Sequence, residues 1–352
     1  LENKLALTQK AMSYASMLTD FTDDGTEIKK AQKALAFCQF HDILPGSAMK
    51  AVEEDSLQTL HYGEEIVDKL YTKAFFKLCQ GQKKAKDGEI PIIAYNPHPY
   101  PVEGDFECEF MLADQNWSGN FHNPVAYRDG VRLPSQCEKE YSNLPLDWRK
   151  RVVFRAELAP MSMNRFDCKI EVLDKKPVGD PVALFGDDPA VMLFIPPHMA
   201  VEITRKTGLI DRLTANGKTY LGKNSCAIDV MQDRHDAWGM TFREWRNKLG
   251  SFTLLSDEEG TAFSDQDATI PSIRVIEDGP VRTVLEVVFG YGDSRARVWY
   301  KLSKQAPVID VETAEIWEAT FAHVQLSGDI REDLLAIART QLGYAESENN
   351  FI

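Results

Sequence analysis

A change in residue pattern between residues 81 and 91 constrains the fold of this 352-residue chain more than any other feature. Before it, apolar residues recur at the spacing of an amphipathic helix, and Pro45 is the only proline. After it, short runs rich in β-branched and aromatic residues are separated by turn residues, a pattern typical of antiparallel strands. The order, helices first and strands afterwards, predicts an α+β protein.

The N-terminal part divides into three helices at two turn sequences. The first turn contains Gly25, after which Thr26 offers a side-chain cap for the next helix. The second is Pro45-Gly46, after which Ser47 offers a cap for a third, longer helix. These positions predict an antiparallel bundle of helices over about residues 2–18, 26–44 and 47–80. The apolar positions expected to face its core are Leu5, Met12, Ala15, Leu18, Ile28, Ala31, Leu35, either Phe37 or Cys38, Val52, Leu60, Val67, Leu70, Ala74 and Leu78.

The segment GQKKAKDGE, residues 81–89, separates the two patterns. It is basic, contains glycine and has no apolar period, which is typical of a domain boundary. We therefore expect a three-helix bundle over residues 1–82 and a large antiparallel β-sandwich over 90–352. The runs expected to form its strands are 91–97, 106–112, 151–158, 166–173, 190–195, 200–205, 272–277, 282–291, 295–302 and 307–317.

The chain carries 40 basic and 54 acidic side chains, a formal net charge of −14. Such a surface repels phosphate backbones and anionic lipids, so neither nucleic acid nor a membrane is an expected partner. The longest apolar runs, such as residues 191–197, fall far short of the ~20 residues that a membrane helix needs. We expect a soluble protein.

Six cysteines are spread at wide and irregular spacings, without a CxxC pair. This usage disfavours a cysteine-based zinc site and predicts free, buried thiols in a reducing cytoplasm. Residue 1 is Leu and lies within the first helical pattern, so we expect the chain to be a piece of a longer protein.

The most informative stretch is FCQFHDILPG, residues 37–46. In it His41 and Asp42 are adjacent, near a predicted helix end and among apolar residues. Neutral imidazole is a common zinc ligand, and a neighbouring carboxylate can bind a ligand that carries hydroxyl groups. However, a single histidine near a helix end is more often a hydrogen-bonded structural residue, and the other histidines are scattered. The residues alone leave both interpretations open.

The run QFHDILPGS, residues 39–47, resembles the signature of glycoside hydrolase family 38 α-mannosidases, in which it closes the second helix of a three-helix bundle. The resemblance covers nearly the whole chain and is loose between residues 111 and 200. Further segments that resemble the family in their order are Ile92–Pro97, Gly208–Leu213, Asp233–Gly239, Glu277–Arg282 and Val308–Val311 followed by Trp317.

This resemblance implies a three-helix bundle followed by a mutarotase-like supersandwich, and a parent enzyme that hydrolyses terminal α-mannosidic bonds with retention and with zinc. By motif position, His41 matches a zinc ligand and Asp42 matches a residue that contacts hydroxyls of the bound mannose. The nucleophile and the general acid would lie in an N-terminal catalytic barrel. The resemblance therefore implies no catalytic residue in this chain, an inactive fragment, and two partners, the missing barrel and mannose-containing saccharides.

One residue next to the signature departs from the family pattern. Cys38 stands where many members carry Asn, which leaves open whether a thiol near the site changes ligand geometry. The simpler interpretation is that Cys38 is a small buried hydrophobic residue.

A protein of another class also fits these residues, namely a carbohydrate-binding or scaffolding module with no catalytic parent. Its sugar contacts would lie around Trp238 or Trp245, with Asp233 and Asp236 nearby, and His41 would be inert. A turn packed by tryptophan is the structural alternative for the same residues.

Two other charged patterns have structural explanations. Glu53–Asp55 lie near the predicted start of the third helix, where negative charge complements the helix dipole. Trp148 is followed by Arg149–Arg151, which resembles a stacking patch. On an acidic protein, however, we expect these basic residues to pair with carboxylates.

Overall fold

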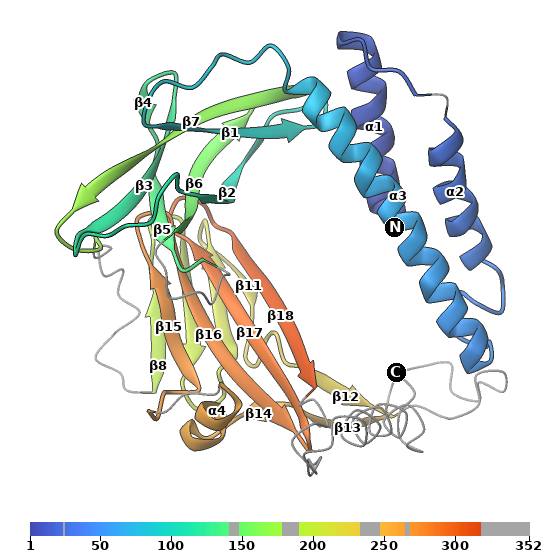
Figure 1. Cartoon of the computed structure of the whole chain (residues 1–352). Coiled ribbons are helices and arrows are strands. Elements are labelled where there is room, and N and C mark those ends of the chain that lie inside the picture. The colour runs from blue at the N-terminus through green and yellow to red at the C-terminus, as the bar shows by residue number, and fades with distance from the viewer. Residues whose placement is uncertain (24, 141–147, 178–189, 233–246, 265–267, 318–352) are drawn as a thin grey trace, which may run out of the picture. The chain divides into compact units, whose positions relative to one another are not determined.

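The computed structural model describes residues 1–23, 25–140, 148–177, 190–232, 247–264 and 268–317. The chain divides into two compact units, the first from Leu1 to Lys175 and the second beginning at Lys176. Within the described residues, helices α1, α2 and α3 and a small sandwich make up the first unit, and a larger sandwich makes up the second (Figure 1). The fold is α+β with antiparallel sheets, as predicted, while the domain boundary between residues 82 and 90 stays a prediction.

The three helices of the first unit are α1 (Glu2–Leu18), α2 (Thr26–Cys38) and α3 (Lys50–Leu78). The bounds predicted for the first helix are confirmed, whereas α2 ends earlier and α3 begins later than predicted. None of the described helices is long and apolar enough to cross a bilayer.

Both predicted side-chain caps are wrong. Gly25 precedes α2 with a left-handed φ of 73°, a conformation that glycine adopts without strain, and its Thr26 neighbour is the first helical residue. Met49 precedes α3 and makes no side-chain cap hydrogen bond. The Ser47 hydroxyl instead donates to the backbone oxygen of Asp42 at 3.4 Å.

Small residues allow the helices to approach closely. Ala11 and Ala15 of α1 and Ala74 of α3 are fully buried. A Cβ atom at Gly63 of α3 would lie 2.8 Å from Cδ2 of Leu1, so a larger residue there would need a shift of the chain's first residue. The bundle is thus held by close packing of short side chains around a core that includes Val67.

Two antiparallel sheets form the sandwich of the first unit, in the orders β1-β7-β3-β4 and β2-β6-β5. Their facing sides share a core in which Phe154 of β6 and Phe166 of β7 meet with ring centroids 4.9 Å apart. The strands are β1 (Glu89–Asn96), β2 (Val102–Met111), β3 (Phe121–Arg128), β4 (Val131–Arg132), β5 (Ser135–Glu138), β6 (Arg149–Leu158) and β7 (Ser162–Leu173).

The Asn-Pro pair at the end of β1 fixes a loop of this sandwich. Asn96 is 1% exposed, and its Oδ1 accepts a hydrogen bond of 3.0 Å from the backbone N–H of His98. Its Nδ2 is within 3.2 Å of three backbone oxygens, those of Tyr100, Leu158 and Ala159. A buried amide with this many partners ties β1 to the end of β6, which gives the Asn-Pro segment a structural role.

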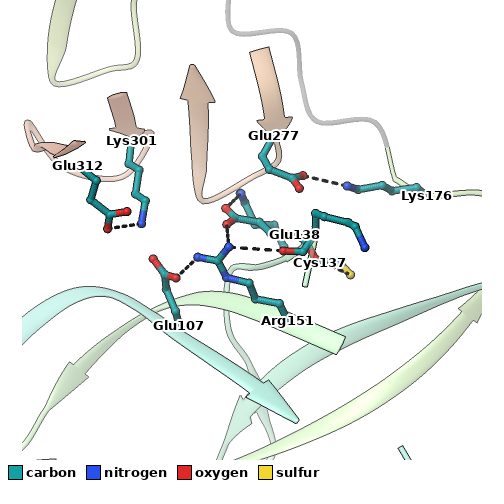
Figure 2. A network of polar contacts seen from close by, with 10 residues as sticks. Glu107, Cys137, Glu138, Arg151, Lys176, Glu277, Lys301 and Glu312 are labelled. Atoms are coloured by element: carbon teal, nitrogen blue, oxygen red, sulfur yellow. Dashed lines mark hydrogen bonds and ion pairs between the residues drawn. The ribbon is translucent and has the colours of Figure 1, made fainter. Parts of the chain in front are cut away.

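An ionic ladder covers one face of β2 and β6. Asp105 and Glu109 of β2 pair with Arg155 and Arg149 of β6 at 3.0 and 3.2 Å. Arg151 of β6 pairs with Glu107 of β2, as Figure 2 shows. Arg149 and Arg151 therefore pair with carboxylates, as predicted, while the Lys150 ammonium lies 5.5 Å from the centroid of the Phe121 ring.

The second unit is a sandwich of a four-stranded sheet, β11-β10-β9-β8, and a five-stranded sheet, β14-β16-β17-β18 with β15 against β16. Strand β16 is buried along nearly its whole length, as expected for the middle of a sandwich. Its elements are β8 (Val191–Phe194), β9 (Met199–Thr204), β10 (Ile210–Ala215), β11 (Lys218–Leu221), β12 (Asp229–Met231), β13 (Lys248–Ser251), β14 (Thr253–Leu254), α4 (Asp257–Phe263), β15 (Ile273–Asp278), β16 (Arg282–Tyr291), β17 (Ser294–Ser303) and β18 (Ile309–Trp317).

Charged side chains within the second unit are paired where they are buried. Glu286 is 6% exposed, and its Oε2 accepts a hydrogen bond of 3.0 Å from the indole N–H of Trp299. Its other oxygen pairs with Arg274. Two further pairs of this unit, Lys301 with Glu312 and Lys176 with Glu277, are drawn in Figure 2.

In the segment GLIDRL, Gly208 and Leu209 end the turn that follows β9, and the remaining residues, 210–213, lie in β10. The Asp211 carboxylate accepts hydrogen bonds from the Thr204 hydroxyl and, at 3.1 Å, from the Asn224 N–H. These bonds, that of Thr204 first, lower the pKa of the Asp211 carboxyl. Gly208 has a left-handed φ of 69°. The segment that resembles the family here is therefore the end of a turn and the first part of a strand, and its polar groups serve the structure.

All six cysteines are free thiols. Cys38 and Cys168 are buried, and burial raises the pKa of the Cys168 thiol to about 12, which keeps it protonated. Cys226 is exposed, so the expectation that every thiol is buried is wrong for this residue. It lies in a turn with φ 68°, next to a β-bridge made by Ser225.

We expect Gly208→Ala to lower the free energy of unfolding by about 2–4 kcal/mol. Backbone strain at the positive φ and overpacking of the new Cβ atom both contribute to this loss. The new Cβ would lie 2.5 Å from Cγ1 of the fully buried Val287, and φ is positive. Gly217, in the turn between β10 and β11, also has a positive φ, 73°, but open space around it. Gly217→Ala should therefore cost only about 1 kcal/mol of backbone strain. Urea unfolding of both variants measures the difference, and equal losses would contradict the packing argument.

Candidate functional site

The QFHDILPGS run lies in the connection between α2 and α3 (Figure 1). The Leu44 N–H donates to the Phe40 oxygen at 3.0 Å and the Gly46 N–H donates to the Ile43 oxygen at 3.1 Å, which winds the chain into a turn. Pro45 has no N–H to continue a helix, and Gly46 takes a left-handed φ of 74°. The sequence therefore holds this stretch outside both helices.

His41 projects into solvent from this turn. Its side chain is 74% exposed, and its ring lies 4.1 Å from the ring of Phe40, centroid to centroid. Its Nε2 lies 3.5 Å from Oδ2 of Asp42, too long for a strong hydrogen bond. An imidazole in this position stabilises the fold little and is open to a ligand.

Asp42 is less exposed and only partly satisfied. Its side chain is 35% exposed, yet its Oδ1 is enclosed and has no hydrogen-bond partner among the described residues. An enclosed carboxylate oxygen without a donor costs free energy, on the order of 1–3 kcal/mol. A donor from outside, such as a ligand hydroxyl group, would remove that cost.

Asp42 lies at the edge of an apolar pocket of about 520 Å³. Aromatic and aliphatic side chains of the turn and of both helix ends line it, and several are unusually exposed, Phe37 at 61% and Met49 at 76%. The remaining lining residues are Phe40, Ile43, Ser47, Ala48 and Val52. A carboxylate at the rim of an exposed apolar surface is typical of a binding site rather than of a closed core.

Cys38 does not take part in this surface. It is 6% exposed, and its Sγ donates to the backbone oxygen of Ser56 at 3.4 Å. Burial raises the pKa of the Cys38 thiol, which disfavours the thiolate that would bind a metal. Cys38 is a small buried residue that joins the end of α2 to α3.

His41 could supply one ligand to a metal ion. Zinc in proteins takes three or four ligands, and His41 offers one nitrogen with no competing strong hydrogen bond. In the part of the chain that the structure describes, no group of three or more His, Cys, Asp or Glu side chains could hold a metal ion. Any complete site would need ligands from elsewhere.

The other candidate residues divide into two groups. Glu53–Asp55 are exposed at the beginning of α3, as the helix-dipole interpretation predicts. Asp233, Asp236, Trp238 and Trp245 lie outside the described residues.

Sequence reasoning missed the apolar pocket. Phe37, Phe40 and Ile43 follow one another at intervals of three residues just before the Pro-Gly break. That spacing was a usable signal, because these side chains extend past the end of α2 and cannot all face the bundle core.

The comparisons with known proteins agree with this local picture. Residues 1–78 match the family described as alpha mannosidase middle domain. That match spans all three helices and the turn with His41 and Asp42. No protein among those with a curated description matches the chain.

A solved structure, that of a protein in the glycosyl hydrolase family 38 from Enterococcus faecalis, has the same fold with a TM-score of 0.63 at 13% sequence identity. The alignment covers 88% of this chain and 43% of that one, so this chain spans less than half of the longer protein. The family-model match bears out the resemblance drawn from the signature run over residues 1–78, and the solved structure shows the same fold over most of the chain.

We expect substitutions of the two site residues to leave the fold intact. His41→Ala should change the free energy of unfolding by less than about 0.5 kcal/mol because the ring is exposed. Asp42→Asn should be neutral or stabilising, because a neutral amide replaces a carboxylate whose enclosed Oδ1 has no donor among the described residues. Leu70→Ala is the control: Leu70 is 3% exposed in the bundle core, and its loss should cost about 2–5 kcal/mol. Urea unfolding measures the free energy of unfolding of all three variants. If His41→Ala loses nearly as much stability as Leu70→Ala, His41 is a structural residue.

Proposed function

We propose, from the membership of residues 1–78 in the alpha mannosidase middle-domain family, that this chain is the middle and C-terminal part of a retaining, zinc-dependent α-mannosidase. The enzyme would hydrolyse terminal α-mannosidic bonds of mannose-containing saccharides. The chain itself would supply a metal ligand, His41, and a sugar contact, Asp42, and no catalytic carboxylate.

The observation that carries this proposal is the state of the two adjacent residues in the family-matched turn. His41 is exposed with no strong partner, and Asp42 has an enclosed oxygen with no donor. The enclosed Asp42 oxygen costs free energy as long as it lacks a donor, and the exposed His41 nitrogen is open to a ligand, so a ligand that meets both explains the pair.

The apolar pocket beside His41 and Asp42 is a second argument for a further domain that packs against this turn. Exposed side chains such as Phe37 and Met49 surround the turn, and a surface of this kind favours burial against protein. The protein from Enterococcus faecalis is more than twice as long as the part that this chain covers. We assign the nucleophile and the general acid to a catalytic domain that covers this pocket in the whole enzyme.

The division of chemistry follows from what each group can do. When bound, zinc would supply a positive charge that binds sugar hydroxyls and so holds the ring in the distorted conformation that cleavage needs. His41 would hold the ion through a ring nitrogen, while the Asp42 carboxylate would accept hydrogen bonds from hydroxyls of the mannose ring. Bond cleavage with retention needs two carboxyl groups about 5–5.5 Å apart, and a single aspartate cannot provide them.

We place the enzyme in the cytoplasm. The support for this location is chemical: all six thiols are free, which fits a reducing compartment. The negative net charge of −14 supports neutral saccharides, rather than nucleic acids, as its ligands.

The 352-residue chain alone should not hydrolyse an aryl α-mannoside, with or without added zinc. The reason is that the proposal assigns both paired carboxylates to the catalytic domain and neither to this chain. A colorimetric assay over a range of zinc concentrations tests this expectation. Turnover that depends on metal and exceeds background would show that the active site lies within this chain.

In the full gene product that contains this chain, His41→Ala should lower zinc affinity by at least tenfold and reduce mannosidase activity in parallel. His61→Ala is a matched control: its side chain is also 74% exposed, and its Nδ1 lies 3.6 Å from a carboxylate oxygen of Glu64. The effect is measured as the amount of zinc bound per protein molecule at several free-zinc concentrations. Inductively coupled plasma mass spectrometry gives this amount. Unchanged zinc affinity in His41→Ala would remove His41 from the metal site.

A further inference from the structure

An exposed tryptophan marks a second surface of the first unit. Trp117 lies in the loop between β2 and β3, and its side chain is 79% exposed. Leaving an indole in water forgoes the large hydrophobic gain that burial of a side chain of this size would bring. Neither the resemblance nor the proposed metal site gives this residue a role.

The loop around Trp117 is ordered by its own hydrogen bonds. The Asn116 Oδ1 accepts from the N–H and the hydroxyl of Ser118 at 2.9 and 2.7 Å. The Asn116 Nδ2 donates to the backbone oxygen of Asn120 at 2.7 Å. A loop held in this way presents its tryptophan in one position, so little conformational entropy is lost when a ligand binds.

The indole itself is oriented by a carboxylate. Its Nε1 donates to Oδ1 of Asp114 at 3.3 Å, and the same oxygen accepts from the Gln115 N–H at 2.8 Å. Because the ring nitrogen is already used, what the side chain offers to a ligand is the flat face of the ring. The Ser118 hydroxyl donates within the loop and accepts one hydrogen bond, from the Asn120 N–H at 3.3 Å, so its oxygen can accept another. This hydroxyl and the side-chain amide of Asn120 can meet polar edges of a ligand.

Further apolar groups lie at the same end of the sandwich. The Leu112 N–H donates to the backbone oxygen of Trp148 at 2.8 Å, which joins the end of β2 to the beginning of β6. Trp148 is 38% exposed and Met111 is 60% exposed. The end of the sandwich from which the Trp117 loop leaves is therefore apolar as well.

We propose that the Trp117 loop is a saccharide-binding site that takes the apolar face of a pyranose ring. The electron-rich face of an indole attracts the C–H groups of such a ring, while neighbouring amide and hydroxyl groups bond its hydroxyls. A neutral sugar suits an acidic protein, which repels anionic ligands. The choice of mannosides as first ligands rests on the proposed function, whereas the site itself does not.

A site made of one aromatic face and a few hydrogen bonds binds weakly, with a dissociation constant in the millimolar range. The probes are methyl α-D-mannopyranoside and methyl β-D-glucopyranoside. The chain is labelled with 5-fluorotryptophan, so that each of its six tryptophans gives a fluorine NMR signal, and the Trp117 signal is assigned by its absence in Trp117→Phe. We expect that signal to shift and saturate with at least one sugar.

Variants of the loop test whether sugar binding depends on the aromatic face of Trp117 or only on an intact fold. Trp117→Ala should weaken sugar binding at least tenfold, whereas Trp117→Phe, which keeps an aromatic face, should weaken it less. Asp114→Ala, which releases the indole N–H, should weaken binding without abolishing it. Tyr220→Ala removes another aromatic side chain, 57% exposed, and should leave binding unchanged.

Three results would overturn the proposal. They are a Trp117 signal that neither sugar moves at concentrations well above the millimolar range, a Trp117→Ala variant that binds sugar as the parent does, and self-association through Trp117 without sugar. Failure of the proposed mannosidase function is read separately, from activity and zinc affinity of the full gene product, and leaves the sugar titration of this chain unaffected.

Discussion

The break at Pro45-Gly46 is the constraint on which both the bundle and the candidate site depend. Proline cannot donate a backbone hydrogen bond, and Gly46 has a left-handed φ of 74°, so no continuous helix can join α2 to α3. The chain must reverse there, which makes the helices antiparallel. The same reversal holds His41 and Asp42 in a turn, where their side chains are not used for packing.

Much of this fold could be predicted because its signals are local. The period of apolar residues identified the three helices, and Val67, Leu70, Ala74 and Leu78 are buried as expected. The Asn216-Gly217 turn lies between β10 and β11, and both residues have the positive φ that this turn type needs. In each case neighbouring residues alone determine the conformation.

The remaining features depend on contacts that no short pattern contains. Val52 has helical spacing but lines the exposed pocket, since the beginning of α3 extends beyond the part of the bundle that α1 and α2 cover. Ser47 could cap a helix, yet its hydroxyl bonds the Asp42 backbone instead. The site pair itself was found through a resemblance, because one histidine beside one aspartate has too little chemistry to be recognised by itself.

The residues that stabilise this fold differ from those proposed to bind ligands, and the difference has a physical reason. Buried groups such as Asn96 and Glu286 have their hydrogen bonds completed within the protein, so nothing remains for a ligand. Asp42 and Trp117 are the opposite case: one has an enclosed oxygen without a donor, the other an apolar face in water. Each lowers stability slightly until something binds. Side chains whose hydrogen bonds or apolar contacts are not made within the described fold are therefore the ones that indicate what the protein contacts.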